Sequence, residues 1–230
     1  MSDLTSYMKG ASNLPAISDE VAGQALATVG EDVTTGSGGI DFLTFSGKSG
    51  AYALGQRKET PDPDQLYLVE PLSVVEGWVC WKKSKPVGRY EWSIYKRDEL
   101  AIPKSDLEDH DVTADGDGWK PSIGFGMATL DGSGTPVKFS LNSVSGRNVL
   151  GDLIKEIGVR QLNKEPHLPI VTLGAEQFEA QDKVNWKPVL DVEAWVTRKA
   201  CEAYFAGDMS DDDLLDGKAP KKKAAKRKKK

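Results

Sequence analysis

The chain reads IGFGMATLDGSGTPVKFSLNSV from Ile123 to Val144, and this stretch decides the fold class. Two runs with strand composition flank Asp131–Gly134, whose glycine, serine and aspartate content is typical of a short connection. We therefore predict an antiparallel β-hairpin with arms at Ile123–Leu130 and Pro136–Val144.

A helix is predicted directly after this hairpin. Its apolar residues recur at spacings of three and four, as on one face of an α-helix; they are Val149, Leu150, Leu153, Ile154 and Ile157. Ser145 is the candidate N-cap and Gly158 the candidate end of the helix.

Shorter strand patterns surround these two elements. Ile40–Phe45 and Ala51–Gly55 are expected to pair around a turn at Gly47–Gly50. Further strands are predicted at Leu66–Val69, Val74–Lys82, Gly88–Tyr95, Ile170–Leu173 and Val189–Val196, and a helix-compatible stretch spans Arg198–Phe205. This order of strands, helix and strands predicts a mainly β fold, specifically a small barrel of the oligonucleotide-binding type with one interposed α-helix and disordered termini.

Charge divides the chain into a body and a tail. Net charge is −5 over 230 residues, but Lys218–Lys230 holds nine basic residues and no acid. The remaining 21 basic residues face all 35 acids, so the body carries a net charge of −14. We predict a flexible arm at residues 1–39, a β-rich domain at 40–205, and a disordered acidic and then polybasic tail at 206–230.

Several classes of protein are disfavoured by composition. No run approaches the length of a membrane span, and the opening MSDLTSYMKG has no apolar core for a secretory signal. Cys80 and Cys201 form no paired motif, and with only His110 and His167 beside them no zinc site is expected. We expect a cytoplasmic protein without a metal or another cofactor.

The most informative stretch for function is Trp78–Arg97. It holds five aromatic and six basic residues with one acid in twenty positions. Single-stranded nucleic acid needs both kinds of residue, since bases stack on flat rings and cations follow the phosphates. Tyr90 and Trp92 would share a strand face with Ile94. The candidate nucleic-acid-binding residues are Trp78, Trp81, Lys82, Lys83, Lys85, Arg89, Tyr90, Trp92, Lys96 and Arg97. The alternative is that these rings belong to the core and the lysines to a solvated turn.

Residues 98–118 carry eight acids against one lysine, and we expect an exposed, mobile loop there. The spacing of its aspartates misses the pattern of a calcium loop, so no metal is assigned to it.

Two segments near the C-terminus have separate predicted roles. The nine cations of Lys218–Lys230 would attract a polyanion with strong salt dependence, although a solubilising or targeting tail fits as well. Before them, Asp211, Asp212, Asp213, Leu214 and Leu215 combine acids with apolar side chains, as a peptide that docks on a protein partner does. The alternative is a simple counterweight to the lysines.

With these features the chain resembles the single-stranded-DNA-binding proteins of bacteriophages. The resemblance lies in length, β-rich layout, acidic body and the acidic segment Asp211–Leu215, and it implies an oligonucleotide-binding barrel with replication proteins as partners. The chain departs from that group by ending in a polybasic run after the acids.

We therefore expect a non-sequence-specific single-stranded-DNA-binding protein of replication or recombination that is not an enzyme. The alternative is a structural or assembly protein of a virion, for which a β-rich fold and charged tails are equally suitable.

Overall fold

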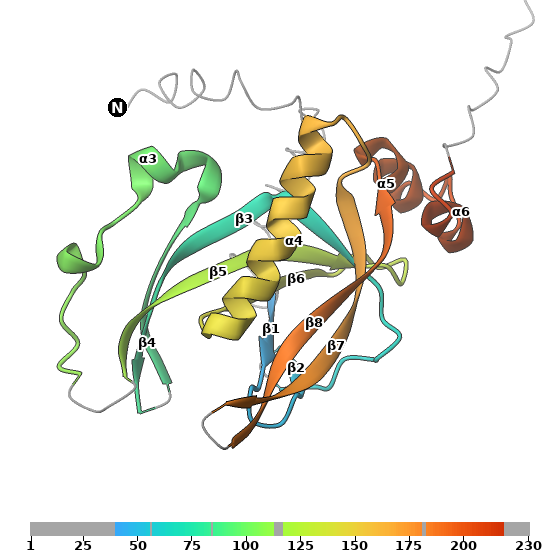
Figure 1. The fold of residues 1–230 in the computed structure, drawn as a ribbon. Coiled ribbons are helices and arrows are strands. Elements are labelled where there is room, and N and C mark those ends of the chain that lie inside the picture. The colour runs from blue at the N-terminus through green and yellow to red at the C-terminus, as the bar shows by residue number, and fades with distance from the viewer. Residues whose placement is uncertain (1–39, 56, 84, 113–116, 181–182, 219–230) are drawn as a thin grey trace, which may run out of the picture. The chain divides into compact units, whose positions relative to one another are not determined.

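One curled sheet of eight strands forms the body of the protein (Figure 1). The computed structural model describes residues 40–55, 57–83, 85–112, 117–180 and 183–218. The strands are β1 (Asp41–Phe45), β2 (Tyr52–Leu54), β3 (Tyr67–Lys82), β4 (Lys85–Ser93), β5 (Gly118–Thr129), β6 (Pro136–Leu141), β7 (Leu168–Ala180) and β8 (Lys183–Val196). Their spatial order is β2-β1-β6-β5-β3-β7-β8, with β4 paired to β3. Among these strands only β1 and β6 run parallel, so the sheet is mixed.

The long strand β3 bends in the middle and has different neighbours before and after the bend. Its first residues pair with β5 and β7, and its residues from Val75 onward pair with β5 and β4. The pairing register shifts between Glu70 and Val75, where Pro71 has no N–H to offer a ladder. Glu70 stabilises this bend by accepting two hydrogen bonds from Arg198, of 2.9 and 2.7 Å.

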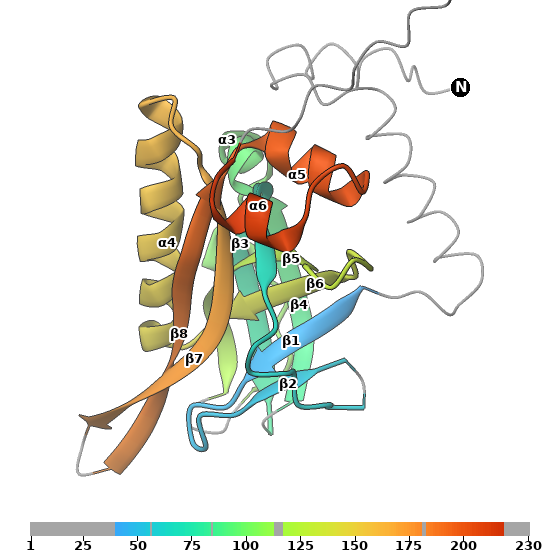
Figure 2. The ribbon, with the colours of Figure 1, turned by 90° about the vertical axis from the view of Figure 1, so that its right-hand side faces the viewer.

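The connectivity of four strands is that of a Greek key. Strands β3, β5 and β6 are neighbours in this order, and β7 returns to lie on the other side of β3, which gives the spatial order 4-1-2-3. The return passes through α4 (Val144–Leu162), which covers one face of the sheet (Figures 1 and 2). We call this face inner and the opposite face outer. The predicted hairpin at 123–144 and the predicted helix are thus confirmed.

The two ends of the strand path approach each other without forming a ladder. The Tyr52 hydroxyl of β2 lies 2.8 Å from the Gly174 carbonyl of β7, and burial raises the pKa of this tyrosine. The backbone N–H of Trp186 in β8 donates to the Gly47 carbonyl, at 2.8 Å. The sheet therefore forms a half-barrel.

The main core lies between the inner face and α4. Its fully buried side chains include Leu43, Phe125, Phe139 and Leu150. The helix begins earlier than predicted, because Ser143 and not Ser145 caps it, with its side chain accepting from the Gly146 N–H. It also continues through Gly158 to Leu162, since burial of Ile157 outweighs the roughly 1 kcal/mol cost of a helical glycine.

The segment after β8 folds further than predicted. Helices α5 (Arg198–Phe205) and α6 (Asp211–Leu215) pack on a second apolar cluster that contains Leu68, Ile170, Tyr204 and Leu214. The prediction of a disordered tail from residue 206 was therefore wrong for 206–218. The arm at 1–39 and the basic run at 219–230 lie outside the described residues.

Candidate nucleic-acid interface

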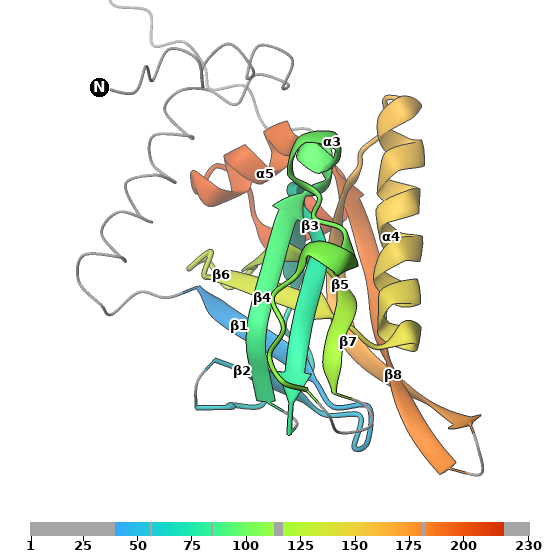
Figure 3. The same cartoon turned by 90° about the vertical axis from the view of Figure 1, so that its left-hand side faces the viewer.

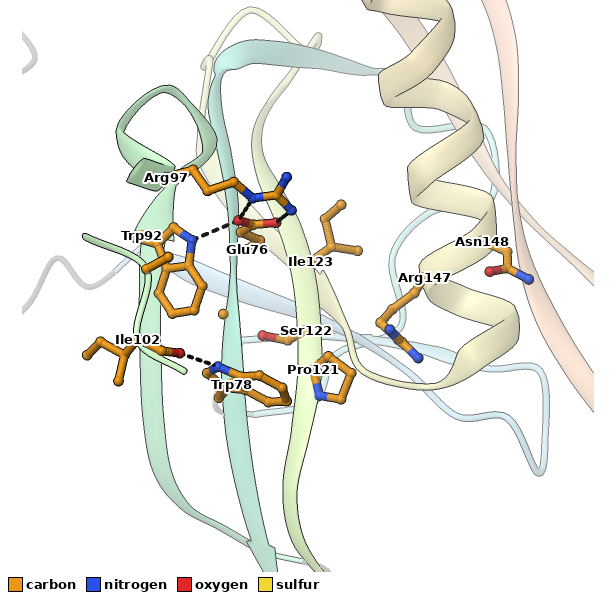
Figure 4. Close-up of a pocket in the computed structure, with 12 residues that line it drawn as sticks. Glu76, Trp78, Trp92, Arg97, Ile102, Pro121, Ser122, Ile123, Arg147 and Asn148 are labelled. Carbon is orange, nitrogen blue, oxygen red and sulfur yellow. Dashed lines mark hydrogen bonds and ion pairs between the residues drawn. The ribbon is translucent and has the colours of Figure 1, made fainter. Parts of the chain in front are cut away.

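The predicted aromatic hairpin forms, but its rings at Trp78, Tyr90 and Trp92 point to the inner face. Strands β3 and β4 pair with Trp78 opposite Tyr90 and Glu76 opposite Trp92. Trp92 is only 9% exposed, and its indole N–H donates to Glu76 at 2.8 Å (Figure 4). A base cannot stack on a ring in this position. Trp92 is a structural residue in this fold, in agreement with the alternative interpretation of the hairpin.

The acidic connection between β4 and β5 contacts the rings of Trp78 and Trp119. We call residues 97–112 the strap; it contains α3 (Arg97–Leu100) and the short 3-10 helix η3 (Lys104–Asp106). The Trp78 indole donates to the Ile102 carbonyl and the Trp119 indole to the Glu108 carbonyl, both at 2.9 Å. Lys82 donates to the His110 carbonyl at 2.8 Å. Most strap residues are exposed, as expected, but these hydrogen bonds hold the strap to Trp78, Lys82 and Trp119.

Two further ring contacts close the aromatic cluster. Trp119 lies with its ring centroid 5.5 Å from that of Tyr90 and 5.3 Å from that of His110. These contacts extend from β4 through β5 to the strap. Tyr90 is half-buried, with its ring tilted against that of Trp119.

The remaining predicted residues are dispersed. Trp81 is half-buried, Lys83 and Lys85 are exposed near the β3–β4 turn, and Lys96 is exposed after β4 in the 3-10 helix η2 (Ile94–Lys96). Arg97 forms two hydrogen bonds with Glu76, of 2.5 and 2.6 Å. Burial of Glu76 opposes ionisation, but the bonds from Arg97 and Trp92 outweigh it and lower the pKa of Glu76.

Of the predicted cations, Arg89 belongs to a different cluster, which lies on the outer face of the sheet. Its guanidinium contacts the Glu91 carboxylate at 3.0 Å and the Ser140 hydroxyl at 3.3 Å. Lys138 of β6 forms an ion pair with the same carboxylate. Both cations lie over the ring of Phe42 in β1, at 5.7 Å for Arg89 and 5.9 Å for Lys138. Phe42 is 46% exposed, so the cluster combines an accessible ring with two cations.

This cluster indicates that the outer face is concave locally, across β4, β3, β5 and β6. Arg89 is on β4 and Ser140 on β6, and in a flat sheet these strands would lie about 14 Å apart, since neighbouring strands are spaced by about 4.8 Å. Side chains that stand perpendicular to a flat sheet cannot bridge that distance. The sheet must therefore curve so that these strands approach each other on its outer side. Small residues permit the fold: a Cβ on Gly77 would lie 1.9 Å from the Tyr90 carbonyl oxygen, and one on Gly124 would lie 2.5 Å from the Ser140 Cβ.

Lysines gather at one end of the sheet. The ends of β1, β3 and β7 and the beginnings of β2, β4 and β8 lie at the same end of the molecule (Figures 1 and 3). These strand ends and the described residues beside them carry Lys48, Lys82, Lys83, Lys85 and Lys183. The concave outer face therefore lies next to a basic rim, even though the body of the chain is acidic.

Sequence reasoning missed Phe42, Lys138 and Ser140. A signal was present in the period-two alternation of both strands. Phe42 lies between Asp41 and Leu43 in a strand whose Leu43 is buried, and Lys138 and Ser140 alternate with the buried Val137 and Phe139. An aromatic residue on the polar side of a strand was the indication of a surface site.

The predicted docking segment Asp211–Leu215 is the helix α6. Leu214 is 1% exposed and packs inside the second apolar cluster. The expectation that Leu214 inserts into a partner's pocket is therefore wrong for this structure. Asp211 and Asp212 remain exposed.

No metal centre is evident in the described part of the chain. No three His, Cys, Asp or Glu side chains gather there in a way that could hold a metal ion. Both cysteines are buried, and burial raises the pKa of Cys201 to about 12, so this thiol is protonated at neutral pH. Among the described helices, none has the length and apolar character needed to cross a membrane.

Comparisons of the chain with known protein families, with curated protein sequences and with solved structures found no match. The functional argument accordingly depends on the geometry of the site.

Proposed function

We propose that the protein binds single-stranded DNA on the concave outer face of β5 and β6, as a non-sequence-specific binding protein of replication or recombination. The half-barrel supports an oligonucleotide-binding type of fold, with β3, β5, β6, β7 and β8 as its five strands and α4 between the third and the fourth. Such barrels bind oligonucleotides on the face of their second and third strands, between the loop that follows strand one and the loop that follows strand four. In this chain that face is the outer side of β5 and β6.

The observation that carries the proposal is the exposed Phe42 ring beneath Arg89 and Lys138. A base can stack on the ring, while the phosphates on either side approach the two cations. Glu91 holds both cations in place in the free protein. A phosphate must therefore compete with this carboxylate, which makes binding dependent on salt.

The basic rim extends the path of the strand beyond the cluster. Lysines at these neighbouring strand ends supply positive charge without a specific geometry, as binding without sequence preference requires. The cations of residues 218–230 would add long-range attraction, and the exposed acids of α6 would serve contacts with replication proteins. Location in the cytoplasm and the absence of catalysis belong to the same proposal.

The proposal is tested by titrating fluorescently labelled oligo(dT) with the protein at two salt concentrations and following anisotropy. We expect saturable binding that weakens at higher salt, and weaker binding of a duplex of equal length. The double variant Arg89→Gln/Lys138→Gln should lower the slope of log K against log salt by about 0.7 for each phosphate that it no longer neutralises.

A matched control removes two exposed cations elsewhere, Lys104→Gln on the strap and Lys155→Gln on α4. It has the same net charge as the test variant and should bind like the wild type. Equal weakening in both variants would assign the effect to net charge and contradict the outer-face site. A protein that binds no oligo(dT) at low salt would favour the virion assembly alternative.

A further inference from the structure

A cavity of about 500 Å³ lies on the inner side of the sheet, between β3, β5, the strap and the first turns of α4 (Figure 4). This volume is in the range of small-molecule sites, which are mostly apolar with a few polar groups. Trp78, Trp92, Pro121 and Ile123 supply flat and apolar walls. The cavity is separate from the outer-face cluster, because its lining side chains belong to the opposite face of the sheet.

The charges in this cavity do not balance. Glu76 is fully engaged, since its carboxylate accepts two bonds from Arg97 and one from Trp92. Arg147 of α4 also lines the cavity, and its Nε is buried with no hydrogen-bond partner. No ion pair of Arg147 with another described residue is present either. One arginine charge in the cavity is therefore uncompensated.

A buried donor without a partner carries a desolvation cost that an anionic acceptor would remove. Arginine is suited to phosphate, because its planar fork donates two parallel hydrogen bonds. The position of Arg147 in the first turns of α4 adds the favourable field of the helix N-terminus. The walls favour a flat ring beside this anion, since aromatic and proline rings provide stacking surfaces.

We propose that this cavity binds a mononucleotide unit, with the phosphate at Arg147 and the base against Trp78 and Pro121. The unit comes either from a free nucleotide or from the 5′-phosphorylated end of a strand. The site does not depend on the proposed outer-face function, and either can fail while the other stands.

Isothermal titration calorimetry with thymidine 5′-monophosphate tests the site directly. We expect saturable binding to the full chain, and binding weaker by about tenfold or more for thymidine, which lacks the phosphate. The variant Arg147→Gln should weaken nucleotide binding by a similar factor of about ten or more and leave thymidine binding unchanged. Lys155→Gln, which removes the same charge from the exposed side of α4, should bind the nucleotide like the wild type.

Two outcomes would overturn the proposal. One is the absence of saturable nucleotide binding to the wild type. The other is weakening by Phe42→Ala rather than by Arg147→Gln, which would place the nucleotide on the outer face. Thermal unfolding of each variant verifies that it is folded.

Oligo(dT) with and without a 5′-phosphate distinguishes the two sources. A preference for the phosphorylated end that disappears in Arg147→Gln assigns the site to strand ends. Equal affinity for both oligonucleotides, together with binding of the mononucleotide, assigns it to free nucleotides.

Discussion

The two faces of the β3–β4 hairpin differ more than its composition suggests. Trp92 and Tyr90 lie on the inner face, where Trp92 donates to Glu76 and Tyr90 contacts the ring of Trp119. Arg89 and Glu91, one residue away from them in β4, lie on the outer face, where Arg89 reaches an exposed phenylalanine. Adjacent strand residues point to opposite sides, so one cluster in the sequence becomes two surfaces in the fold. The inner surface is contacted by the strap, and the outer one presents Arg89 beside the exposed ring of Phe42.

Among the substitutions that separate the two faces, Trp92→Ala should have the largest effect, which is a loss of stability. Removal of a buried indole costs about 3–5 kcal/mol of unfolding free energy, and Glu76 loses a hydrogen bond as well. Affinity of the folded protein for oligo(dT) without a 5′-phosphate, which the outer face is proposed to bind, should not change. Chemical denaturation and anisotropy measure the two quantities.

Val87→Ala in the same hairpin is the control, because Val87 is exposed and its truncation should change stability by less than about 0.5 kcal/mol. A stable Trp92→Ala variant with weakened DNA binding would mean that the inner face is the binding surface after all.

The substitution Phe42→Ala should show the reverse pattern. We expect DNA binding to weaken by about 1–3 kcal/mol if one base stacks on this ring, with little change in the unfolding transition. Phe205→Ala removes an aromatic ring of similar exposure from α5 and is the matched control. Equal affinities of the two variants would remove Phe42 from the interface.

The substitution Glu91→Gln should strengthen DNA binding, by up to about 1 kcal/mol. Without this carboxylate, Arg89 and Lys138 no longer have an internal anion that competes with phosphate. Glu76→Gln removes an acid from the inner face and should not tighten binding. Anisotropy at low salt measures both, and tighter binding in the two variants alike would indicate a general effect of charge.

The smallest expected effect is the pH dependence of stability that comes from Glu76 on the inner face. The pKa of Glu76 is lowered from its ordinary value of 4.5 by Arg97 and Trp92, against the opposing effect of burial. A lowered carboxylate pKa contributes stability that is present above the unfolded value and is lost as the pH falls through the folded value. Thermal unfolding below pH 4.5 should therefore depend on pH more steeply in the wild type than in Glu76→Gln. Parallel curves for the two proteins would show that this ion pair does not contribute to stability.

Local patterns predicted much of the secondary structure. The hairpin at 123–144 and the helix that follows were predictable because strand composition, turn residues and helical spacing act over short distances. Strand lengths were less predictable. The single strand β3 was expected as two strands, and β7 and β8 extend well beyond Ile170–Leu173 and Val189–Val196. Long partners stabilise residues whose own composition has a weak strand preference.

The residues of the candidate site were only partly predictable from the sequence. An aromatic and basic hairpin pointed to a strand-binding protein, yet of its ten candidate residues only Arg89 joins the outer-face cluster. The ring and the second cation come from β1 and β6, far from the hairpin in sequence. Parallel pairing of β1 with β6 brings them together, and pairing over such a distance leaves no local pattern in the sequence.

The hairpin, the helix and the separation of an acidic body from a basic end could be predicted from the sequence, because each of these depends on neighbouring residues. The covered face of β3 and β4, and the place of Leu214 in the core, depend on tertiary packing. Both faces of that hairpin carry large or apolar side chains, so alternation defines two sides without saying which one is covered. The strap covers part of the inner face of β3 and β4, and α6 packs on a cluster that includes Leu68 and Ile170, which are distant from it in the chain.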